Sequence, residues 1–492
     1  MKLNIFVMNG FRAGGSPFGG AFPGFPPGVS PGAFVRQLLL KAVAVMLAVI
    51  LPVLLFRARA LADADLSIVA VLFLLRSALL RDWSWLRARW LQWGLGLWGL
   101  ITLSSAFTGP FASFMQGLLT LRFFIFCAAL AFWVLTGSRA RKSLAFVCAF
   151  LAIWTIAECW EQYLTGTNIF GYPRWGDGAL TGPFVHPKAG NALLMVLFPG
   201  AMPGILRRLS DNSWRRRLNG GLLLLLCVAT MILIGQRMSA VLTFLGLLLT
   251  ALLVKPMRLP VLGAVALGGV LLVALPVVSP PSYAKLVLKF THQLAHFASS
   301  DYGQLFGRAG AMVEAHPFLG LGFDGFRLHC LDPSYLHDMP LLGIPYVAPP
   351  ESGCNLHPHN YYLQVATAAG LPGLLLFVLM ALSWLRIVVR PHLPVPGVER
   401  MARTSETVPP TPENAMLLVA LCVQLWPLAS TSALFSVPPA GWLFLTAGWA
   451  LAAAGAGSRS GQQPDMEPPP VQDDWSAFSR PETVIRQDDL LR

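Results

Sequence analysis

The chain has 492 residues, of which 55% are hydrophobic and only 12% are charged, and its formal net charge is +13. Soluble globular domains carry about 25% charged residues, so this composition leaves too little polar surface to cover a fold in water. The positive charge does not indicate nucleic-acid binding, because the basic residues fall in short clusters between apolar runs.

Apolar runs long enough for a helix to cross a bilayer, which needs about 20 residues, recur along the whole chain. They predict an all-α polytopic membrane protein with about twelve transmembrane helices. The predicted spans are 34–56, 66–80, 90–106, 114–135, 143–164, 189–206, 220–235, 238–254, 259–278, 359–385, 415–432 and 438–454. The run 66–80 is short and contains Arg76, a residue that is costly inside a bilayer.

The basic clusters occupy every second connection, which is the pattern of the positive-inside rule. It predicts that both termini are cytoplasmic. The Gly- and Pro-rich N-terminal stretch and the polar, Pro-rich C-terminal stretch predict disordered tails over 1–33 and 455–492, and no cleavable signal peptide is evident. One conflict remains, because Arg57 and Arg59 fall in an outer connection, where Asp63 and Asp65 offset their charge.

The outer connections differ in length, with a moderate loop over 165–188 and a long one over 279–358 between nine spans (34–278) and three spans (359–454). Long connections are uncommon unless they are functional or disordered. This one has too many aromatic, Gly-Phe and His residues for disorder, so it predicts a large periplasmic loop with short helices. Cys330 and Cys354 share it and can pair if it faces an oxidising compartment, although spacing alone does not show that they approach.

Two patterns in the outer connections resemble metal sites. Seven of the nine histidines lie in or beside the long loop, but their spacings form no compact ligand motif, and the two loop cysteines are not a C-x-x-C pair. Asp63-Ala-Asp65 has a spacing that can hold Mg²⁺ or Mn²⁺. A match this short arises often by chance, and aspartates that cap the next helix are more common. We therefore expect no metal and no cofactor.

The strongest functional signal lies where the long loop meets the next apolar run. It begins with His357-Pro-His359-Asn360 and continues to Gly370-Leu-Pro-Gly373. A histidine at the mouth of a span can act as a neutral base near neutral pH. The glycines allow another helix to approach closely.

This segment resembles the O-antigen ligases and related polysaccharide polymerases. Their shared pattern is a His followed by Asn, Ser or Gln, nine residues, and then G-x-x-G, which His359, Asn360, Gly370 and Gly373 match. The resemblance covers roughly 90–450 in order and topology, and it is specific mainly over 300–375.

Three further segments are similar to the same family. Arg308 precedes His316-Pro317 and Gly320-x-Gly322, as in the family's Arg…HPxxGxG segment. Arg237 stands at an external turn between two spans, as the family's other arginine does. The segment 181–187, with His186, resembles the preceding loop, but Lys188 stands where we expect Asn, so its role is open.

The resemblance implies a membrane glycosyltransferase at the periplasmic face of the bacterial inner membrane. It would move a glycan from undecaprenyl diphosphate to a sugar hydroxyl of a lipid-anchored acceptor, of the lipid A–core type. His359 would take the proton of that hydroxyl. Arg237 and Arg308 would clamp the diphosphate, because a guanidinium is a permanently charged fork that fits phosphate oxygens. The other candidates for substrate binding are Asn360, Arg122, His316 and His186.

Other interpretations stay open at this stage. A polymerase of the same family extends a glycan on its own carrier, a transporter binds the lipid-linked glycan without transforming it, and a membrane scaffold has no chemistry. The absence of an evident internal repeat counts against a transporter. Single residues also have structural interpretations: Arg237 can extend to the membrane interface, Arg308 can pair with a nearby carboxylate, and His359 can cap the following helix. The functional prediction therefore depends on the convergence of these three residues around one pocket.

Overall fold

The computed structural model describes residues 31–392, 411–429 and 433–455. Contacts divide the chain into two units, of which Val35–Gly461 holds nearly all of these residues. The other unit, Met1–Phe34 with Gln462–Arg492, contributes only Pro31–Phe34 at the start of the first helix. The predicted tails therefore lie almost entirely outside the described residues.

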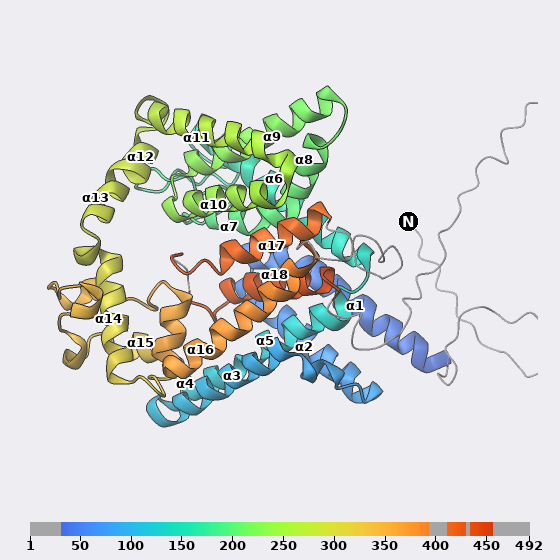
Figure 1. Ribbon diagram of the computed structural model, residues 1–492, viewed down its shortest axis with the longest axis vertical. Coiled ribbons are helices and arrows are strands. Elements are labelled where there is room, and N and C mark those ends of the chain that lie inside the picture. The colour runs from blue at the N-terminus through green and yellow to red at the C-terminus, as the bar shows by residue number, and fades with distance from the viewer. Residues whose placement is uncertain (1–30, 393–410, 430–432, 456–492) are drawn as a thin grey trace, which may run out of the picture. The chain divides into compact units, whose positions relative to one another are not determined.

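The regular elements in the described ranges are helices, joined by turns that include two isolated β-bridges. Each of the twelve predicted apolar runs contains at least one helix, so the all-helical fold class is confirmed. The α-helices are α1 (Pro31–Arg57), α2 (Arg59–Leu80), α3 (Arg89–Thr108), α4 (Phe111–Leu119), α5 (Leu121–Ala129), α6 (Ser138–Thr165), α7 (Ala189–Val196), α8 (Met202–Leu209), α9 (Trp214–Ile234), α10 (Arg237–Leu253), α11 (Arg258–Val278), α12 (Pro280–Tyr283), α13 (Lys289–Ala295), α14 (Asp301–Ala315), α15 (Gly325–His329), α16 (Tyr361–Val389), α17 (Pro412–Gln424) and α18 (Pro439–Ala453) (Figure 1).

Within the described ranges, seven helical segments are long and apolar enough to cross a membrane. They are Val35–Arg57, Phe111–Val134, Ser138–Thr165, Ala189–Leu209, Trp214–Ile234, Lys255–Val278 and Tyr361–His392. On α11, Val273 and Val277 are 82% and 89% exposed, a surface that lipid covers and water disfavours. The chain is thus a multi-pass membrane protein, and crossings beyond these seven stay a prediction.

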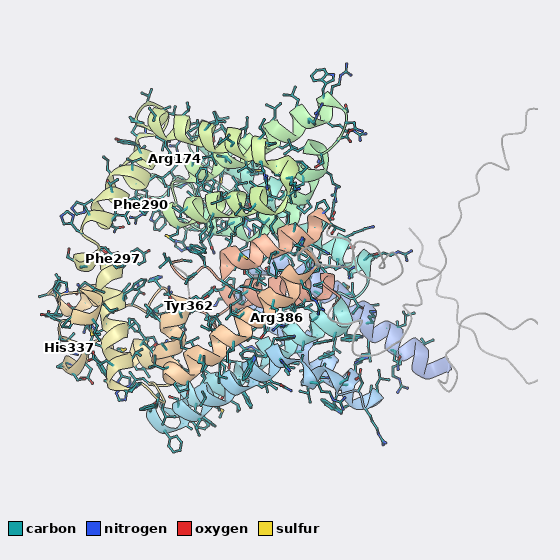
Figure 2. All side chains as sticks on the ribbon, viewed as in Figure 1. Arg174, Phe290, Phe297, His337, Tyr362 and Arg386 are labelled. Atoms are coloured by element: carbon teal, nitrogen blue, oxygen red, sulfur yellow. A yellow bond between two sulfur atoms is a disulfide. The ribbon has the colours of Figure 1, made fainter. Side chains whose placement is uncertain are left out.

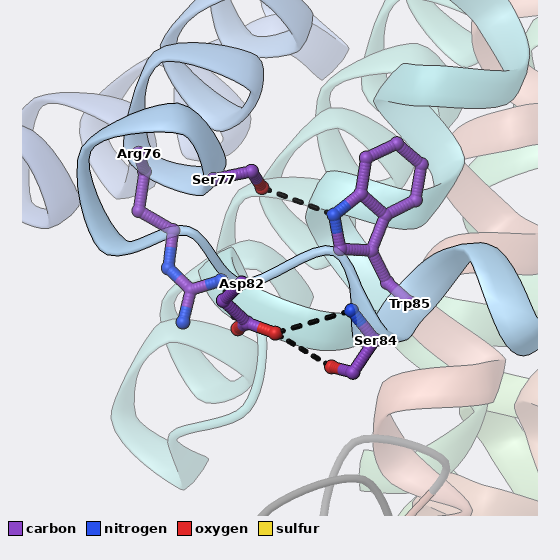
Figure 3. Close-up of polar contacts among 5 residues, drawn as sticks. All are labelled: Arg76, Ser77, Asp82, Ser84 and Trp85. Carbon is purple, nitrogen blue, oxygen red and sulfur yellow. Dashed lines mark hydrogen bonds and ion pairs between the residues drawn. The ribbon is translucent and has the colours of Figure 1, made fainter.

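Polar contacts fix the short connection between α2 and α3 (Figure 3). The Arg76 guanidinium forms an ion pair of 2.8 Å with Asp82, and Asp82 accepts hydrogen bonds from the backbone N–H and the hydroxyl of Ser84. The indole N–H of Trp85 donates to the Ser77 hydroxyl at 3.0 Å. Because Arg76 is paired with a carboxylate, its place in an apolar helix costs less than that of an isolated charge.

The long loop 279–358 is folded and carries the short helices α12 to α15, as predicted. In Figure 1 these helices connect α11 with α16, and Figure 2 places His337 at the outer edge of the loop. The loop has a hydrophobic cluster of its own, built from Leu305, Ala309, Ala311, Met312, Leu321, Phe326, Cys330, Tyr335, Met339 and Ile344. A segment with its own apolar cluster can hold side chains in place above the membrane helices.

Candidate functional site

The helix α16 contains a break at the G-x-x-G motif. Ala369 and Gly370 leave the helical conformation, and Gly370 adopts φ 65° and ψ −170°, a combination that is open essentially only to glycine. A Cβ at Gly370 would lie 2.6 Å from the carbonyl atoms of Pro317 and Phe318. The sequence predicted two glycines inside a continuous helix that another helix approaches. The structure instead uses Gly370 to interrupt the helix and admit a turn.

The turn that enters this break is the HPxxGxG segment after α14. Its backbone pairs with that of α16, since Leu321 N donates to Thr367 O at 2.8 Å and Gly322 N donates to Ala368 O at 3.0 Å. In return, Leu371 N donates to Pro317 O at 2.7 Å. The two motifs with the strongest family likeness are therefore one interlocked unit.

The other side of this turn rests on α3. The hydroxyl of Ser105 accepts a hydrogen bond of 2.8 Å from Phe323 N. Gly322 has a φ of +79°, and a Cβ there would lie 2.8 Å from Ser105 Cα. The turn is thus held between α3 and α16, and it carries the next residues, Phe323 to Arg327, to the wall of a cavity.

That cavity has a volume of about 880 Å³. Its walls come from the α1–α2 corner, from α4 and the start of α5, from the segments 184–192 and 323–327, from 356–367, and from 433–442. All of these segments lie in, or next to, connections that the sequence predicts on the extracytoplasmic side. The cavity therefore gathers the predicted outer ends of helices that are far apart along the chain.

The charge of the cavity wall is mostly positive. Five cationic side chains line it, those of Arg57, Arg59, Arg122, Lys188 and Arg327, against the carboxylates of Asp63 and Asp324. Three positive charges are therefore in excess if the lining histidine is neutral. Positive clefts with apolar walls raise the local concentration of anionic substrates.

Two of these arginines are paired with the two aspartates. Arg122 contacts Asp63 Oδ1 through Nε and Nη2, each at 3.0 Å, and its Nη1 donates to Leu119 O at 2.7 Å. Arg327 Nη2 lies 3.0 Å from Asp324 Oδ2. Arg122 was predicted from the sequence as a substrate-binding residue, whereas Asp324 and Arg327 were not predicted at the site. Their only signal was their position directly after the G-x-G turn.

The aspartates of the D-x-D pattern do not share a site. The sequence predicted them in a loop, but α2 begins at Arg59, so both lie in its first turns. Helix residues two apart do not face each other: Asp63 pairs with Arg122, whereas Asp65 is buried, with 3% of its surface exposed. No group of three or more potential metal-ligating side chains occurs within the part of the chain that the structure describes.

Two histidines lie side by side at the start of α16. His357 lines the cavity, and its ring centroid is 4.4 Å from that of His359. Asn355 Nδ2 lies 3.1 Å from His359 Nε2, and the ring of Tyr302 packs edge-on at 6.0 Å. The backbone of His359 has a φ of +53°. This left-handed conformation is uncommon for a side-chain-bearing residue, and it recurs at functional sites.

His359 itself is not among the cavity-lining residues, so the structure adds His357 to the candidate site. His357 is visible in the sequence as the first histidine of His357-Pro-His359, although the resemblance implies a role only for the second.

The two arginines of the predicted clamp lie elsewhere. Arg308 on α14 is 4% exposed, and its Nη1 donates to Cys330 O at 2.9 Å. Burial lowers the pKa of its guanidinium, although arginine stays charged in proteins. Arg237, at the start of α10, donates to the side-chain oxygen of Gln293. Neither is among the cavity-lining residues, and nor is His359. The cavity therefore does not bring together the three residues whose convergence the sequence predicted, and the role of the two arginines as a clamp stays a prediction.

Asn360 has a structural position at the N-terminus of α16. It is 6% exposed, and its side-chain oxygen accepts from Tyr362 N and Leu363 N, which caps the helix. Its Nδ2 donates to Pro427 O at 2.7 Å. These bonds orient the start of α16, and with it the two preceding histidines.

His316 and His186 each contact an aromatic side chain. His316 Nε2 lies 2.9 Å from the hydroxyl oxygen of Tyr335, inside the folded loop. His186 packs edge-on against Trp175, with ring centroids 5.3 Å apart, in the loop 165–188. Neither residue lines the cavity, so their role in substrate binding, like that of Asn360, stays a prediction.

A disulfide joins Cys330 to Cys354, whose Cα atoms are 5.5 Å apart, which confirms the possibility left open by the sequence. It ties the end of α15 to the segment that leads to His357.

We expect Cys354→Ser to destabilise the loop by about 3 kcal/mol, as for other closed loops of this size. Thermal unfolding with and without reductant measures this loss, and Cys422→Ser in α17 is the control. Rapid alkylation of Cys354 in intact, unreduced cells would contradict the pairing.

Comparison with known proteins identifies a domain that covers about a third of the chain. Residues 222–378 match the family model described as O-antigen ligase, which confirms the resemblance over a stretch that includes Arg237, Arg308 and His359. Enzymes with this domain are membrane glycosyltransferases. No curated protein matches the chain. The matched stretch supplies the segments 323–327 and 356–367 of the cavity wall, whereas the α1–α2 corner and the segments 184–192 and 433–442 lie outside it.

Proposed function

We propose that the protein, which carries an O-antigen ligase domain over residues 222–378, transfers a glycan from undecaprenyl diphosphate to a sugar hydroxyl of a lipid-anchored acceptor of the lipid A–core type. The observation that carries the proposal is the positive cavity beside His357 and His359, whose wall includes two segments of that domain. A cavity of about 880 Å³ is within the range of pockets that enclose a small ligand, and it accommodates a diphosphate with its neighbouring sugars.

The proposed reaction forms a bond between the acceptor oxygen and the anomeric carbon of the donor glycan. The bond from that carbon to the diphosphate oxygen breaks, and the lipid diphosphate leaves with the bonding electrons. His359 takes the proton of the acceptor hydroxyl, and His357, whose ring packs against it, helps to align it. General-base assistance of this kind typically contributes about 10²–10⁴ in rate.

Arginine side chains would hold the negative charge that develops on the leaving diphosphate. Arg122 is supported by its place in the cavity wall, where Asp63 orients its guanidinium. Arg237 and Arg308 are supported by the family resemblance and by their place in the matched domain. A bidentate guanidinium fits two phosphate oxygens at once, so one to three arginines can neutralise this group without a metal ion.

The proposed location is the inner membrane, with both termini in the cytoplasm and the cavity facing the periplasm. Two observations support this orientation. The cavity-lining segments belong to, or adjoin, the connections on one predicted side, and the disulfide Cys330–Cys354 lies in the long loop on that same side. Disulfides persist in the periplasm and are rare in the cytoplasm.

Surface polysaccharide from a deletion strain tests this function on a gel. Loss of a ligase leaves long glycan chains that are not attached to lipid A–core, and re-expression of the protein restores attachment. Loss of a polymerase would instead leave single repeats on the acceptor. Loss of a transporter would leave lipid-linked glycan in the cytoplasmic leaflet. Either of the last two patterns would reject the ligase assignment.

A further inference from the structure

The corner between α1 and α2 places two arginines at the cavity. α1 ends at Arg57 and α2 begins at Arg59, with only Ala58 between them. Both arginine side chains are exposed and line the cavity, together with Lys188 from the segment before α7. None of these three cations takes part in an ion pair with the residues that the structure describes. The corner therefore carries positive charge that no ion pair among the described residues neutralises.

Neighbouring groups hold these cations without cancelling their charge. The Arg57 guanidinium lies 4.4 Å from the ring centroid of Phe170 and 5.3 Å from that of Trp154, and an aromatic face attracts a cation but leaves its hydrogen-bond donors free. Lys188 is the N-cap residue of α7, so the positive end of that helix dipole adds to the local potential.

Membrane orientation does not explain the positive charge of this corner. Arginines in outer connections oppose the positive-inside rule, so they do not serve to orient the chain. Three cations without an ion-pair partner in the described part of the chain, in a cavity that faces away from the cytoplasm, favour a ligand group with more than one negative charge. Phosphate is such a group, and it accepts several charge-assisted hydrogen bonds at once.

We infer that Arg57, Arg59 and Lys188 form a phosphate-binding corner of the cavity, outside the matched O-antigen ligase domain. This inference rests on the proposed function for the identity of its ligand. Two substrates carry the chemistry: the diphosphate of the donor lipid and a phosphate on the acceptor saccharide. The corner thus gives the protein a recognition element that acts on a phosphorylated substrate and is separate from the histidines.

Binding to the full-length protein in nanodiscs of neutral lipid tests the corner. The donor probes are undecaprenyl diphosphate and undecaprenol, which lacks the phosphates. The acceptor probes are a phosphorylated core oligosaccharide and the same compound after phosphatase treatment. The variant is Arg57→Gln with Arg59→Gln and Lys188→Gln. The matched control is Lys289→Gln, which removes an exposed cation on α13 that does not line the cavity.

We expect each removed cation to weaken the binding of one phosphorylated probe by about tenfold, or about 1.4 kcal/mol, because its charge-assisted hydrogen bonds to the phosphate are lost. Undecaprenol, the dephosphorylated saccharide and the Lys289→Gln control should show no change. A loss confined to undecaprenyl diphosphate assigns the corner to the donor, and a loss confined to the phosphorylated saccharide assigns it to the acceptor. Arg57→Lys with Arg59→Lys should retain most of the affinity, which separates loss of charge from misfolding.

Unchanged affinity of the triple variant for both phosphorylated probes would overturn the proposal that this corner binds phosphate. Glycan transfer by the wild-type protein is measured in the same nanodiscs, so the two proposals can fail separately. If the wild type transfers glycan and the triple variant binds phosphate as the wild type does, the phosphate-binding role of the corner is rejected and the proposed function is retained. Phosphate binding that depends on the corner, in a wild type that transfers no glycan, rejects the proposed function instead.

Discussion

Replacing His359 by asparagine is expected to lower glycan transfer by about 10²–10⁴, the range for loss of a general base. The variant removes the proton acceptor, because an amide nitrogen has no basic lone pair. Asparagine also tolerates the left-handed backbone that His359 adopts, with its φ of +53°. The protein should therefore still insert in the membrane and bind undecaprenyl diphosphate. Transfer by purified protein from a lipid-linked donor to a core acceptor measures the effect.

Two further variants make this test specific. His337→Asn changes an exposed histidine at the outer edge of the same loop and should leave transfer unchanged (Figure 2). His357→Asn removes the histidine that lines the cavity, and we expect a smaller loss than for His359→Asn. Wild-type transfer by His359→Asn, with a large loss in His357→Asn, would show that His357 and not His359 acts as the general base.

Replacing Gly370 by alanine is expected to destabilise the protein by at least about 2 kcal/mol and to abolish most of the transfer activity. Alanine is strained at φ 65° and ψ −170°, and its Cβ would lie 2.6 Å from carbonyl atoms of Pro317 and Phe318. The turn 316–322 could then no longer occupy the break in α16. Because the same turn carries Phe323 to Arg327 to the cavity wall, the wall should be displaced with it.

The apparent melting temperature in detergent and the transfer rate measure these two effects. Gly99→Ala in α3 is the matched control, since a Cβ at Gly99 meets no atom within 4 Å. Alanine is favoured over glycine inside a helix, so the control should melt no lower than the wild type. A Gly370→Ala protein with wild-type melting temperature and transfer would show that the interlocked turn does not matter for the site.

The sequence by itself determined the class of the protein, the places of its helices and the stretch that matches the O-antigen ligase family. These are local properties: an apolar run of sufficient length forms a helix in lipid wherever it occurs, and a motif such as His359-Asn360 followed by Gly370 is written in neighbouring residues. Arg57 and Arg59 were visible as an exception to the charge pattern, although no role could be assigned to them from the pattern alone.

Only the tertiary structure decided which side chains meet. The cavity is lined by segments that range from the α1–α2 corner to Trp442, and no local pattern specifies which helix ends pack together. His357 and His359 are two residues apart, yet only His357 lines the cavity, and His359 has a left-handed backbone. Gly370 breaks its helix rather than packing it, since the turn 316–322 hydrogen-bonds to the backbone exposed there. Such outcomes depend on contacts between distant segments, which is why spacing along the chain did not predict them.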